Sequence, residues 1–320
     1  MDDRIEGLPE RLMVAIGGNA LHPGNAGPGG QNEAARADHA AQALLPLLLG
    51  CRQLVITHGN GPVVGEILLR QFHAREFVPS MPLDVCVAAS QGVIGYLIAQ
   101  SLENALIKAG KARAVAYMLT EVDVDANDPA FASPSKPVGP FFTLDKARAM
   151  SADGWSMMED AGRGWRLAVP SPAPLAIVNL SVIDVALRSG SIVVAGGGGG
   201  IPVVRAKDGT RSGVRAVVDK DLTSALLARA LGIDQLLILT SVPRVAIRFR
   251  QTGEQWLDTV AVGQMRRYRN EGHFAPGSMA PKVDAALAFL AGGGRRVIIA
   301  HLHDAMAALR GDAGTHVVPD

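Results

Sequence analysis

Short, unbroken runs of apolar residues recur along the chain and stop abruptly at glycine or polar positions. Such runs, without polar alternation, are typical of strands buried on both faces of a sheet. They predict strands at residues 12–16, 53–57, 191–195, 235–240 and 296–300, and the more mixed segment 113–124 resembles another strand.

Between these runs, apolar residues recur at the three- and four-residue spacing of helices. The expected helices cover residues 33–49, 63–75, 88–109, 144–150, 181–189, 219–231 and 281–292. Buried strands that alternate with helices predict an α/β fold, with an open, mostly parallel sheet and helices on both faces. We expect a single domain over residues 1–320.

Residues 125–174 interrupt this alternation. The segment is rich in proline and, apart from the short helix expected near 144–150, its apolar residues follow no regular period. A long irregular stretch inside a regular fold is typically a functional excursion. We interpret it as a protruding lid subdomain within the main domain.

Composition narrows the class of protein. Lys and Arg total 31 and Asp and Glu total 30, a net charge of +1, which lacks the basic excess of a general nucleic-acid binder. Cys51 and Cys86 are too few for a disulfide scaffold, and we expect two buried free thiols.

Residues 1–11 lack the apolar core of a signal peptide, and the apolar stretch 43–49 is too short to span a membrane. We expect a soluble, cytoplasmic protein that binds neither nucleic acid nor membrane.

Three of the predicted strands end in glycine-rich turns. In open α/β sheets the ligand lies beyond the carboxyl ends of the strands, where glycines let backbone N–H groups approach a phosphate. The turns are Gly17-Gly18-Asn19, Gly59-Asn60-Gly61 and the run from Gly196 through Gly197, Gly198 and Gly199 to Gly200. No P-loop motif is present, and the glycine spacing after the second strand does not fit the dinucleotide fingerprint. Each turn alone is a common loop, but three at strand ends point to an oxyanion site.

Three lysines lie in contexts that suit phosphoryl transfer, which needs positive charge on the transferring oxygens more than covalent chemistry. They are Lys136, Lys220 and Lys282. Surface lysines at the ends of elements would give the same pattern. Asp219 and Asp221 flank Lys220 and could orient the lysines or bind through Mg²⁺. We interpret the histidines His58, His301 and His303 as structural.

A series of motifs, in order along residues 12–315, resembles the carbamate kinase family within the amino acid kinase superfamily. The series comprises Ala15-Ile-Gly-Gly-Asn-Ala-Leu21, Thr57-His-Gly-Asn-Gly-Pro62, Pro82-Leu-Asp84, Gln91-Gly92, Ile94-Gly-Tyr96, Asp128-Pro-Ala-Phe131, Lys136-Pro-Val-Gly-Pro-Phe141, Val169-Pro-Ser-Pro172, Gly196-Gly-Gly-Gly-Gly-Ile-Pro-Val203, Asp219-Lys-Asp-Leu222, Gly272-His-Phe-Ala275, Gly277-Ser-Met279 and Pro281-Lys282.

This resemblance implies an α/β/α sandwich, a homodimer and a reversible reaction in which carbamoyl phosphate and ADP give carbamate and ATP, with Mg²⁺ held by the nucleotide phosphates. It implies an N-terminal half that binds carbamate or carbamoyl phosphate and a C-terminal half that binds the nucleotide. The pathway stays open among arginine metabolism, allantoin breakdown and cyanate-derived carbamate.

The resemblance also assigns roles to single residues. Lys136 would reach the transferred phosphoryl group from the lid, and Asp221 would organise the lysines. The implied catalytic residues are Lys136, Lys220, Asp221 and Lys282. The implied substrate-binding residues are Gly17, Gly18, Asn19, Gly59, Asn60 and Gly61. The implied nucleotide-binding residues are Gly196, Gly197, Gly198, Gly199, Thr240, Ser241, Met279 and Lys282.

The chain departs from the family pattern at several positions. Thr240-Ser241-Val242-Pro243-Arg244 stands where the family reads Thr-Asp-Val, at the border of the adenosine site. Ala280 replaces a common glycine, Glu121 replaces a glutamine, and the first loop is glycine-rich over 24–30. These departures keep two alternatives open: a kinase of another small carboxylate or carbamate, and a non-catalytic ligand-binding member of the family.

Overall fold

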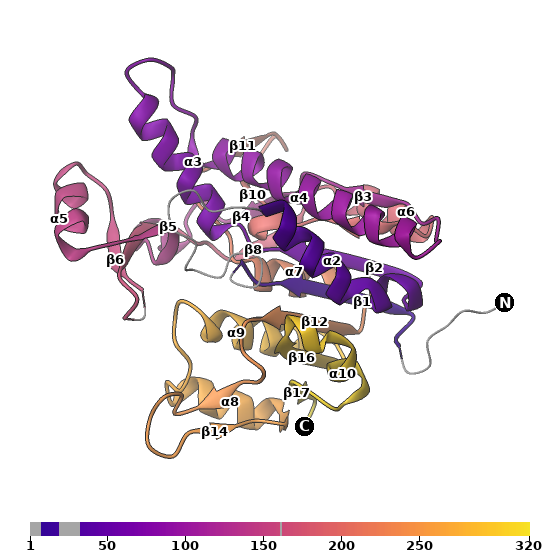
Figure 1. The fold of residues 1–320 in the computed structure, drawn as a ribbon. Coiled ribbons are helices and arrows are strands. Elements are labelled where there is room, and N and C mark those ends of the chain that lie inside the picture. Colours follow the sequence, from indigo (N-terminus) through magenta and orange to yellow (C-terminus); the bar gives the residue numbers. More distant parts are fainter. Residues whose placement is uncertain (1–7, 19–32, 161) are drawn as a thin grey trace.

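The core of the molecule is an eight-stranded sheet (Figure 1). The structure is a computed structural model, and it describes residues 8–18, 33–160 and 162–320. In spatial order the strands are β15 (Thr259–Ala261), β17 (Thr315–Val318), β16 (Arg296–His301), β12 (Gln235–Thr240), β1 (Arg11–Ile16), β2 (Gln53–His58), β9 (Ile192–Val194) and β3 (Val115–Tyr117). Neighbouring strands pair in parallel except β16 with β17. The expected open, mostly parallel sheet is therefore confirmed.

Helices cover both faces of this sheet, because alternate residues of each central strand point to opposite sides. Leu12, Val14 and Ile16 of β1 pack in one core, and Met13 and Ala15 pack in the other. The first core lies under α2 (Glu33–Gly50), α3 (Gly61–Ala74), α4 (Leu83–Lys108) and α10 (Ala305–Arg310). The second lies under α6 (Leu180–Arg188), α7 (Lys220–Ala230), α8 (Val262–Asn270) and α9 (Met279–Ala291). The α/β/α sandwich places the carboxyl ends of the parallel strands at one edge.

The segment 113–124 is not the single strand that its sequence predicts. It divides into β3, in the main sheet, and β4 (Glu121–Val124), in a second sheet whose other strands are β11 (Arg211–Gly213), β10 (Ile201–Arg205) and β8 (Pro174–Ile177). The chain changes sheets at Thr120. Its backbone bonds to the side chain of Gln91, and its hydroxyl accepts from the N–H of Gly196 at 2.8 Å. These buried bonds replace the ladder that a continuous strand would make.

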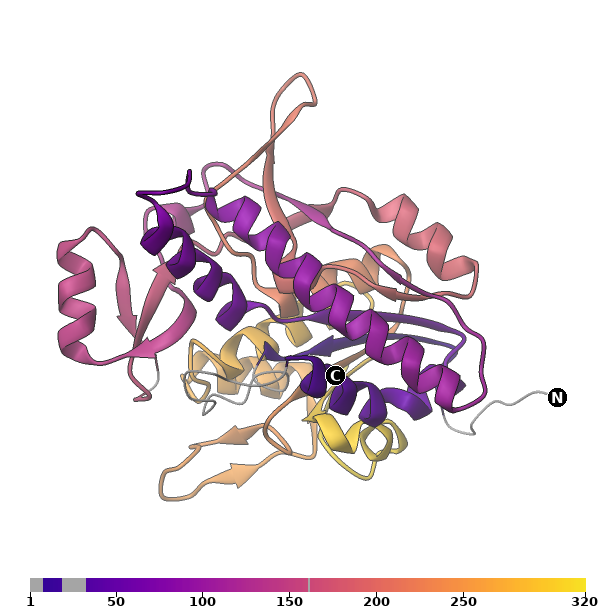
Figure 2. The ribbon, with the colours of Figure 1, turned by 45° about the horizontal axis from the view of Figure 1, so that its top comes forward.

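The proline-rich excursion contains a small three-stranded sheet of its own, well to one side of the main sheet in Figure 2. Its elements are β5 (Lys136–Phe142), α5 (Leu144–Ala152), β6 (Met157–Glu159) and β7 (Trp165–Val169), preceded by the 3₁₀ turn η1 (Pro129–Phe131). We call residues 136–169 the lid. Gly65 of α3 meets Gly139 of β5 so closely that a Cβ on Gly65 would lie 2.1 Å from the Gly139 backbone. Through this close contact between two glycines, the lid packs against α3.

Four further short elements follow strands of the main sheet in the chain. They are β13 (Ala246–Ile247) and β14 (Gln255–Trp256), which form a hairpin after β12, and the 3₁₀ turns η2 (Gly197–Gly199) after β9 and η3 (Leu302–Asp304) after β16.

Helix α4 begins five residues earlier than the sequence predicts, directly after Pro82. Within the described part of the chain it is the one helix long and apolar enough to cross a membrane by length and composition. Of its most apolar window, 56% is buried inside the fold, where it packs on α2 and α3. Its apolar character is explained by this packing.

Candidate active site

The three glycine turns meet at the carboxyl edge of the main sheet, because β1, β2 and β9 are neighbours there. The N–H of Gly59 donates to the carbonyl of Ile16 at 3.0 Å, and a Cβ on Gly59 would lie 2.6 Å from the Gly18 nitrogen. Gly198, at φ +62°, lies so close to Asn60 that a Cβ there would be 2.1 Å from the Asn60 amide nitrogen. The backbones of Gly59 and Gly18 pack directly on each other, and the buried Asn60 side chain packs on the backbone of Gly198, which leaves no room for a Cβ at Gly59 or Gly198. Asn19, and the glycine-rich loop 24–30, lie outside the described residues.

A cavity of about 430 Å³ opens at this edge, between the lid and the C-terminal half. Most of the residues that the sequence singled out line it. These are Gly17, Gly18, Gly59, Asn60, Gly61, Lys136, Gly198, Lys220, Asp221, Thr240, Met279 and Lys282. The structure does not bring every residue to the cavity. Gly196, Gly197 and Gly199 are buried and outside its lining, and Ser241 is exposed and outside it too.

The amino terminus of α7 organises the lysines. Asp219 caps the helix by accepting from the N–H groups of Asp221 and Leu222 at 2.9 and 3.4 Å, which is why the helix begins at Lys220. Lys220 Nζ donates to Asp221 Oδ1 at 2.6 Å, and Lys282 Nζ, from the first turn of α9, donates to Asp221 Oδ2 at 2.9 Å. We call Lys220, Asp221 and Lys282 the buried triad. One carboxylate therefore holds two cations at fixed positions in the cavity wall.

The protonation states of the buried triad follow from burial and charge. Burial lowers the pKa of Lys220 to about 8, against the opposing effect of Asp221. Burial acts in the same direction on Lys282, but the charge and hydrogen bond of Asp221 outweigh it and raise the Lys282 pKa. Burial would raise the pKa of Asp221, but the two lysines hold it well below its usual range. The triad carries two positive charges and one negative charge near neutral pH.

Lys136 approaches the same centre from the lid. It is the first residue of β5, and its ammonium group donates to Asp219 Oδ2. Its side chain keeps 22% of its surface exposed, whereas the Lys220 side chain keeps 8%. Lys136 is thus the most accessible of the three cations, at the boundary between the lid and the cavity.

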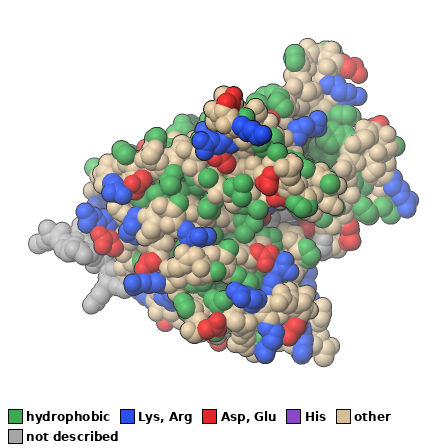
Figure 3. Space-filling view, turned by 180° about the vertical axis from the view of Figure 1, so that it is seen from behind, with side chains coloured by type: hydrophobic (Ala, Val, Ile, Leu, Met, Phe, Trp, Pro, Cys, Tyr) green, Lys and Arg blue, Asp and Glu red, His purple; other side chains and the backbone are tan. Residues whose placement is uncertain are grey.

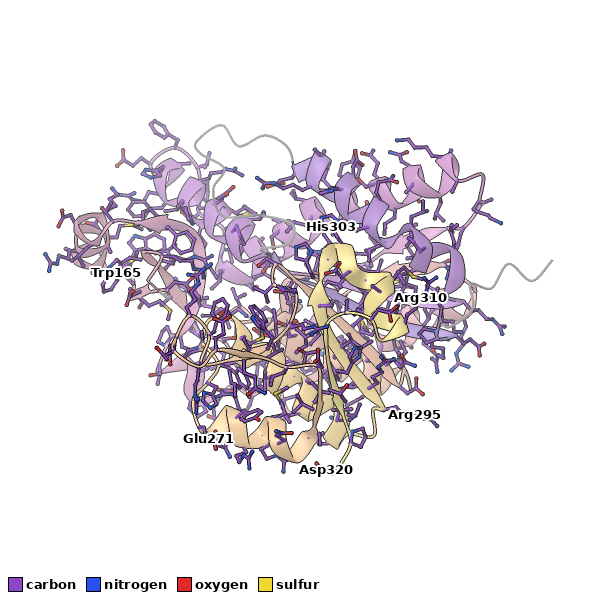
Figure 4. The ribbon with its side chains drawn as sticks, turned by 60° about the horizontal axis from the view of Figure 1, so that its bottom comes forward. Trp165, Glu271, Arg295, His303, Arg310 and Asp320 are labelled. Carbon is purple, nitrogen blue, oxygen red and sulfur yellow. The ribbon has the colours of Figure 1, made fainter. Side chains whose placement is uncertain are left out.

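Arg166 is a cavity residue that sequence reasoning missed. It lies on β7 of the lid, the strand that Trp165 marks in Figure 4. Its Nε donates to the Gly139 carbonyl at 2.8 Å and its Nη1 to Asp160 at 3.0 Å. Burial lowers the pKa of its guanidinium, and Asp160 opposes that effect by hydrogen bond and charge. The apolar run Leu167-Ala168-Val169 that follows it is the one local signal that could have indicated a strand here.

The C-terminal half also lines the cavity. The segment that runs from β12 into the hairpin of β13 and β14 contributes Val242, Arg244, Ala246, Phe249 and Gln251. Arg244 forms an ion pair with Asp258. Of the departures from the family pattern that follow Thr240, Arg244 therefore lines the cavity.

The described histidines are not grouped as a metal site. Burial lowers the pKa of His58 to about 4, so its ring is neutral in the fold. His303, at the carboxyl end of β16 (Figure 4), packs its ring against His39 and His301 at 4.5 and 5.2 Å between centroids. Among the described residues, no three His, Cys, Asp or Glu side chains are grouped to hold a metal ion. These contacts agree with a structural interpretation of His58, His301 and His303.

The comparisons with known proteins agree with this arrangement. The model of the amino acid kinase family matches residues 10–301, so the chain belongs to that family and is a kinase with its fold.

Within the family its full-length relatives include carbamate kinases and carbamate kinase-like proteins. The chain is 46% identical over 316 residues to the carbamate kinase-like protein YahI of Escherichia coli K12, covering 97% of this chain and 99% of that one. It is 44% identical over 315 residues to the carbamate kinase of Pyrococcus horikoshii, covering 98% and 100%. Carbamate kinase from Giardia lamblia bound to citric acid superposes with a TM-score of 0.91 at 38% identity, covering 98% and 100%. The same enzyme bound to AMP-PNP gives a TM-score of 0.86. The resemblance to carbamate kinases is therefore confirmed.

Proposed function

We propose that this protein transfers a phosphoryl group reversibly between carbamoyl phosphate and ADP, giving carbamate and ATP. The observation that carries the proposal is that the buried triad and Lys136, which bonds the neighbouring Asp219, line one cavity. Fixed positive charges at the place where phosphoryl oxygens gain charge are the main requirement of this chemistry.

Each group of residues in the cavity has its own role in the proposed reaction. The turns at Gly17-Gly18 and Gly59-Asn60-Gly61 surround the carbamoyl phosphate, which accepts from the N–H of Gly61 at the start of α3, and Lys136 contacts the phosphoryl group that moves. The N–H groups of Gly17 and Gly59 hold the turns in place by donating to the carbonyls of Leu239 and Ile16. Lys220 and Lys282 neutralise the oxygens of the phosphoryl group and of the nucleotide β-phosphate. The bond from phosphorus to the carbamoyl oxygen breaks as the bond to the β-phosphate oxygen forms, and carbamate leaves with the electron pair. No covalent enzyme intermediate is needed.

Mg²⁺ arrives with the nucleotide in this proposal. Asp219 and Asp221 already accept from lysines and from the amino terminus of α7, and no three-ligand cluster exists in the described residues. Such a donor set suits a cation that is held mainly by phosphate oxygens. Chelation of Mg²⁺ is expected to abolish turnover and to leave the Tm of the nucleotide-free protein unchanged.

The structure gives no support to the two alternatives, a kinase of another small carboxylate or carbamate and a non-catalytic ligand-binding member of the family. Glu121, the departure on the substrate side, is exposed on β4 and does not line the cavity. It therefore gives no reason for a different acceptor. All three lysines are in place, which argues against a non-catalytic member of the family.

We also propose a homodimer in the cytoplasm. Large apolar side chains are exposed close together on α4, around β3 and at the start of α6. They include Val93, Tyr96, Tyr117, Leu119 and Val182, at 43 to 57% exposed. Asn179 donates to the Leu119 carbonyl at 2.9 Å, which joins α6 to this surface. A patch of this kind marks an interaction site. Cys51 and Cys86 are buried free thiols, as in reducing compartments.

Elsewhere the surface mixes charges of both signs. Figure 3 shows basic and acidic side chains interspersed on one face, without a continuous basic stripe.

The test is coupled ATP formation from carbamoyl phosphate, ADP and Mg²⁺, run beside GDP, CDP and UDP. We expect turnover with ADP. Turnover with another nucleotide alone would assign a changed base preference to the hairpin of β13 and β14. Phosphorylation of acetylglutamate or aspartate, with no turnover of carbamoyl phosphate, would overturn the proposal.

A further inference from the structure

Arg166 presents an unused hydrogen-bond donor to the cavity. The residue is 9% exposed, and it lines the cavity. Two of its three guanidinium nitrogens are engaged, Nε by Gly139 and Nη1 by Asp160. No described residue accepts from Nη2. Of the side-chain atoms around Gly61, Nη2 is the one that would meet a Cβ there, at 3.8 Å.

The place that Nη2 faces is suited to an anion for a second reason. Gly61 is the first residue of α3, a 14-residue helix, and Asn60 precedes it. The N–H groups at the start of a helix have no partner inside it and favour negative charge. Asn60, Gly61, Lys136 and Arg166 all line the cavity at this end.

Arg166 is held in place by a carboxylate that is itself buried. Asp160 is 3% exposed and accepts from Arg166 and from Arg163. A charged side chain fixed in this way loses little conformational entropy when it binds a ligand, so its remaining donor is preorganised.

We propose that Arg166 binds the planar carbamate end of the substrate, the part that is not transferred, and sets the affinity for it. The assignment rests on the function proposed above and deepens it. When the bond from phosphorus to oxygen breaks, carbamate gains a full negative charge on that oxygen. A guanidinium beside the start of α3 stabilises this leaving group, and in the reverse direction it positions carbamate for attack on the γ-phosphorus of ATP.

The test separates the two substrates. Arg166→Ala is expected to raise the KM for carbamoyl phosphate, and for carbamate in the reverse reaction, by about ten- to a hundredfold. The KM for ADP is expected to change less than about threefold. Arg166→Lys does not rescue the KM, because an ammonium group cannot reproduce the three directions of the guanidinium. A purely structural role would lower the Tm and raise both KM values together, which would overturn the assignment.

Arg163→Ala is the matched control. Arg163 shares Asp160 with Arg166 at 2.9 Å but does not line the cavity. Its loss is expected to leave both KM values unchanged. Asp160→Asn, which loosens Arg166 without removing it, is expected to raise the KM for carbamoyl phosphate alone, by less than Arg166→Ala does.

Calorimetry of carbamoyl phosphate with the nucleotide-free protein separates this assignment from the proposed function. Weaker binding to Arg166→Ala than to the wild type supports the assignment, even if the wild type shows no turnover and the proposed function fails. Equal binding to both proteins, or no binding to the wild type, refutes it.

Discussion

Asp221 is the residue on which the charge balance of the cavity depends, and Asp221→Asn tests that balance. The substitution keeps the size of the side chain but removes the charge that two buried lysines share. Removing one partner of a buried ion pair typically costs about 3–5 kcal/mol.

The cost is shared by the two lysines. Lys220 can escape its unpaired charge by losing a proton. From its folded-state pKa of about 8 to an assay at about pH 7, at about 1.4 kcal/mol for each pH unit, this costs about 1.4 kcal/mol. The rest falls on Lys282, whose pKa is raised by the same carboxylate.

Thermal denaturation is the assay. For a chain of 320 residues, an unfolding entropy of about 2.1 cal/mol/K per residue converts that cost to a Tm loss of about 4–7 °C at pH 7. Asp184→Asn breaks an exposed pair with Arg188 and, as the control, is expected to move Tm by less than about 1 °C.

The pH dependence has a definite sign. Because the folded-state pKa of Lys220 lies below the unfolded value, the unfolded chain binds the proton more tightly, and stability rises with pH between about 8 and 10.5. In Asp221→Asn the folded-state pKa falls further and this window opens at lower pH. The part of the gap that comes from Lys220 is therefore largest near pH 6 and small near pH 9, where the part that comes from Lys282 remains. Adding Lys220→Met to Asp221→Asn should recover part of the lost stability. A gap that does not change with pH, or no recovery in the double variant, would refute the reasoning.

Other perturbations test Lys136 of the lid, the contact between the lid and α3, and the buried His58. Lys136→Ala is expected to lower kcat by at least about a hundredfold with Tm nearly unchanged, since its side chain is partly exposed; steady-state kinetics and a melting curve check this, and near-normal kcat would remove Lys136 from the mechanism. Gly65→Ala places a methyl group 2.1 Å from Gly139, so it should displace the lid and lower kcat while ADP binding by calorimetry persists; unchanged kcat would show that the contact does not position the lid. His58 has a pKa of about 4 in the fold against 6.5 ordinarily, so stability falls as pH drops through this range, by about 2 kcal/mol at pH 5. His58→Gln should flatten the change of Tm between pH 7 and 5, and an equally steep change in both proteins would contradict the buried neutral ring.

The sequence predicted the main sheet well, because the central strands are uninterrupted apolar runs bounded by glycine. It failed where hydrogen bonds of distant residues decide the structure. The division of residues 113–124 at Thr120 depends on Gln91 and Gly196, neither of which is near in the chain. The earlier start of α4 depends on Pro82, whose extended backbone precedes the helix.

In the candidate site, too, the sequence predicted what local patterns show and missed what distant contacts decide. The glycine turns and the lysines were visible as local patterns, and the resemblance supplied their roles. The pairing of Lys136 with Asp219, 83 positions away, is set by the lid and not by spacing. Arg166 was missed because its strand lies in a segment with little periodicity, and because its significance comes from Asp160 and Gly61 together.

The direct packing of the glycine turns limits how this enzyme can be altered. At Gly59 and Gly198 any side chain would collide with a neighbouring turn, and the groups that these turns offer the substrate are main-chain atoms that every substitution shares. Random mutagenesis of these turns should therefore yield inactive proteins and almost no altered specificities. Changes of substrate preference are accessible only through side chains that reach the cavity from outside the turns, such as those of the lid and of the hairpin after Thr240. A library aimed at a new acceptor or a new nucleotide belongs there.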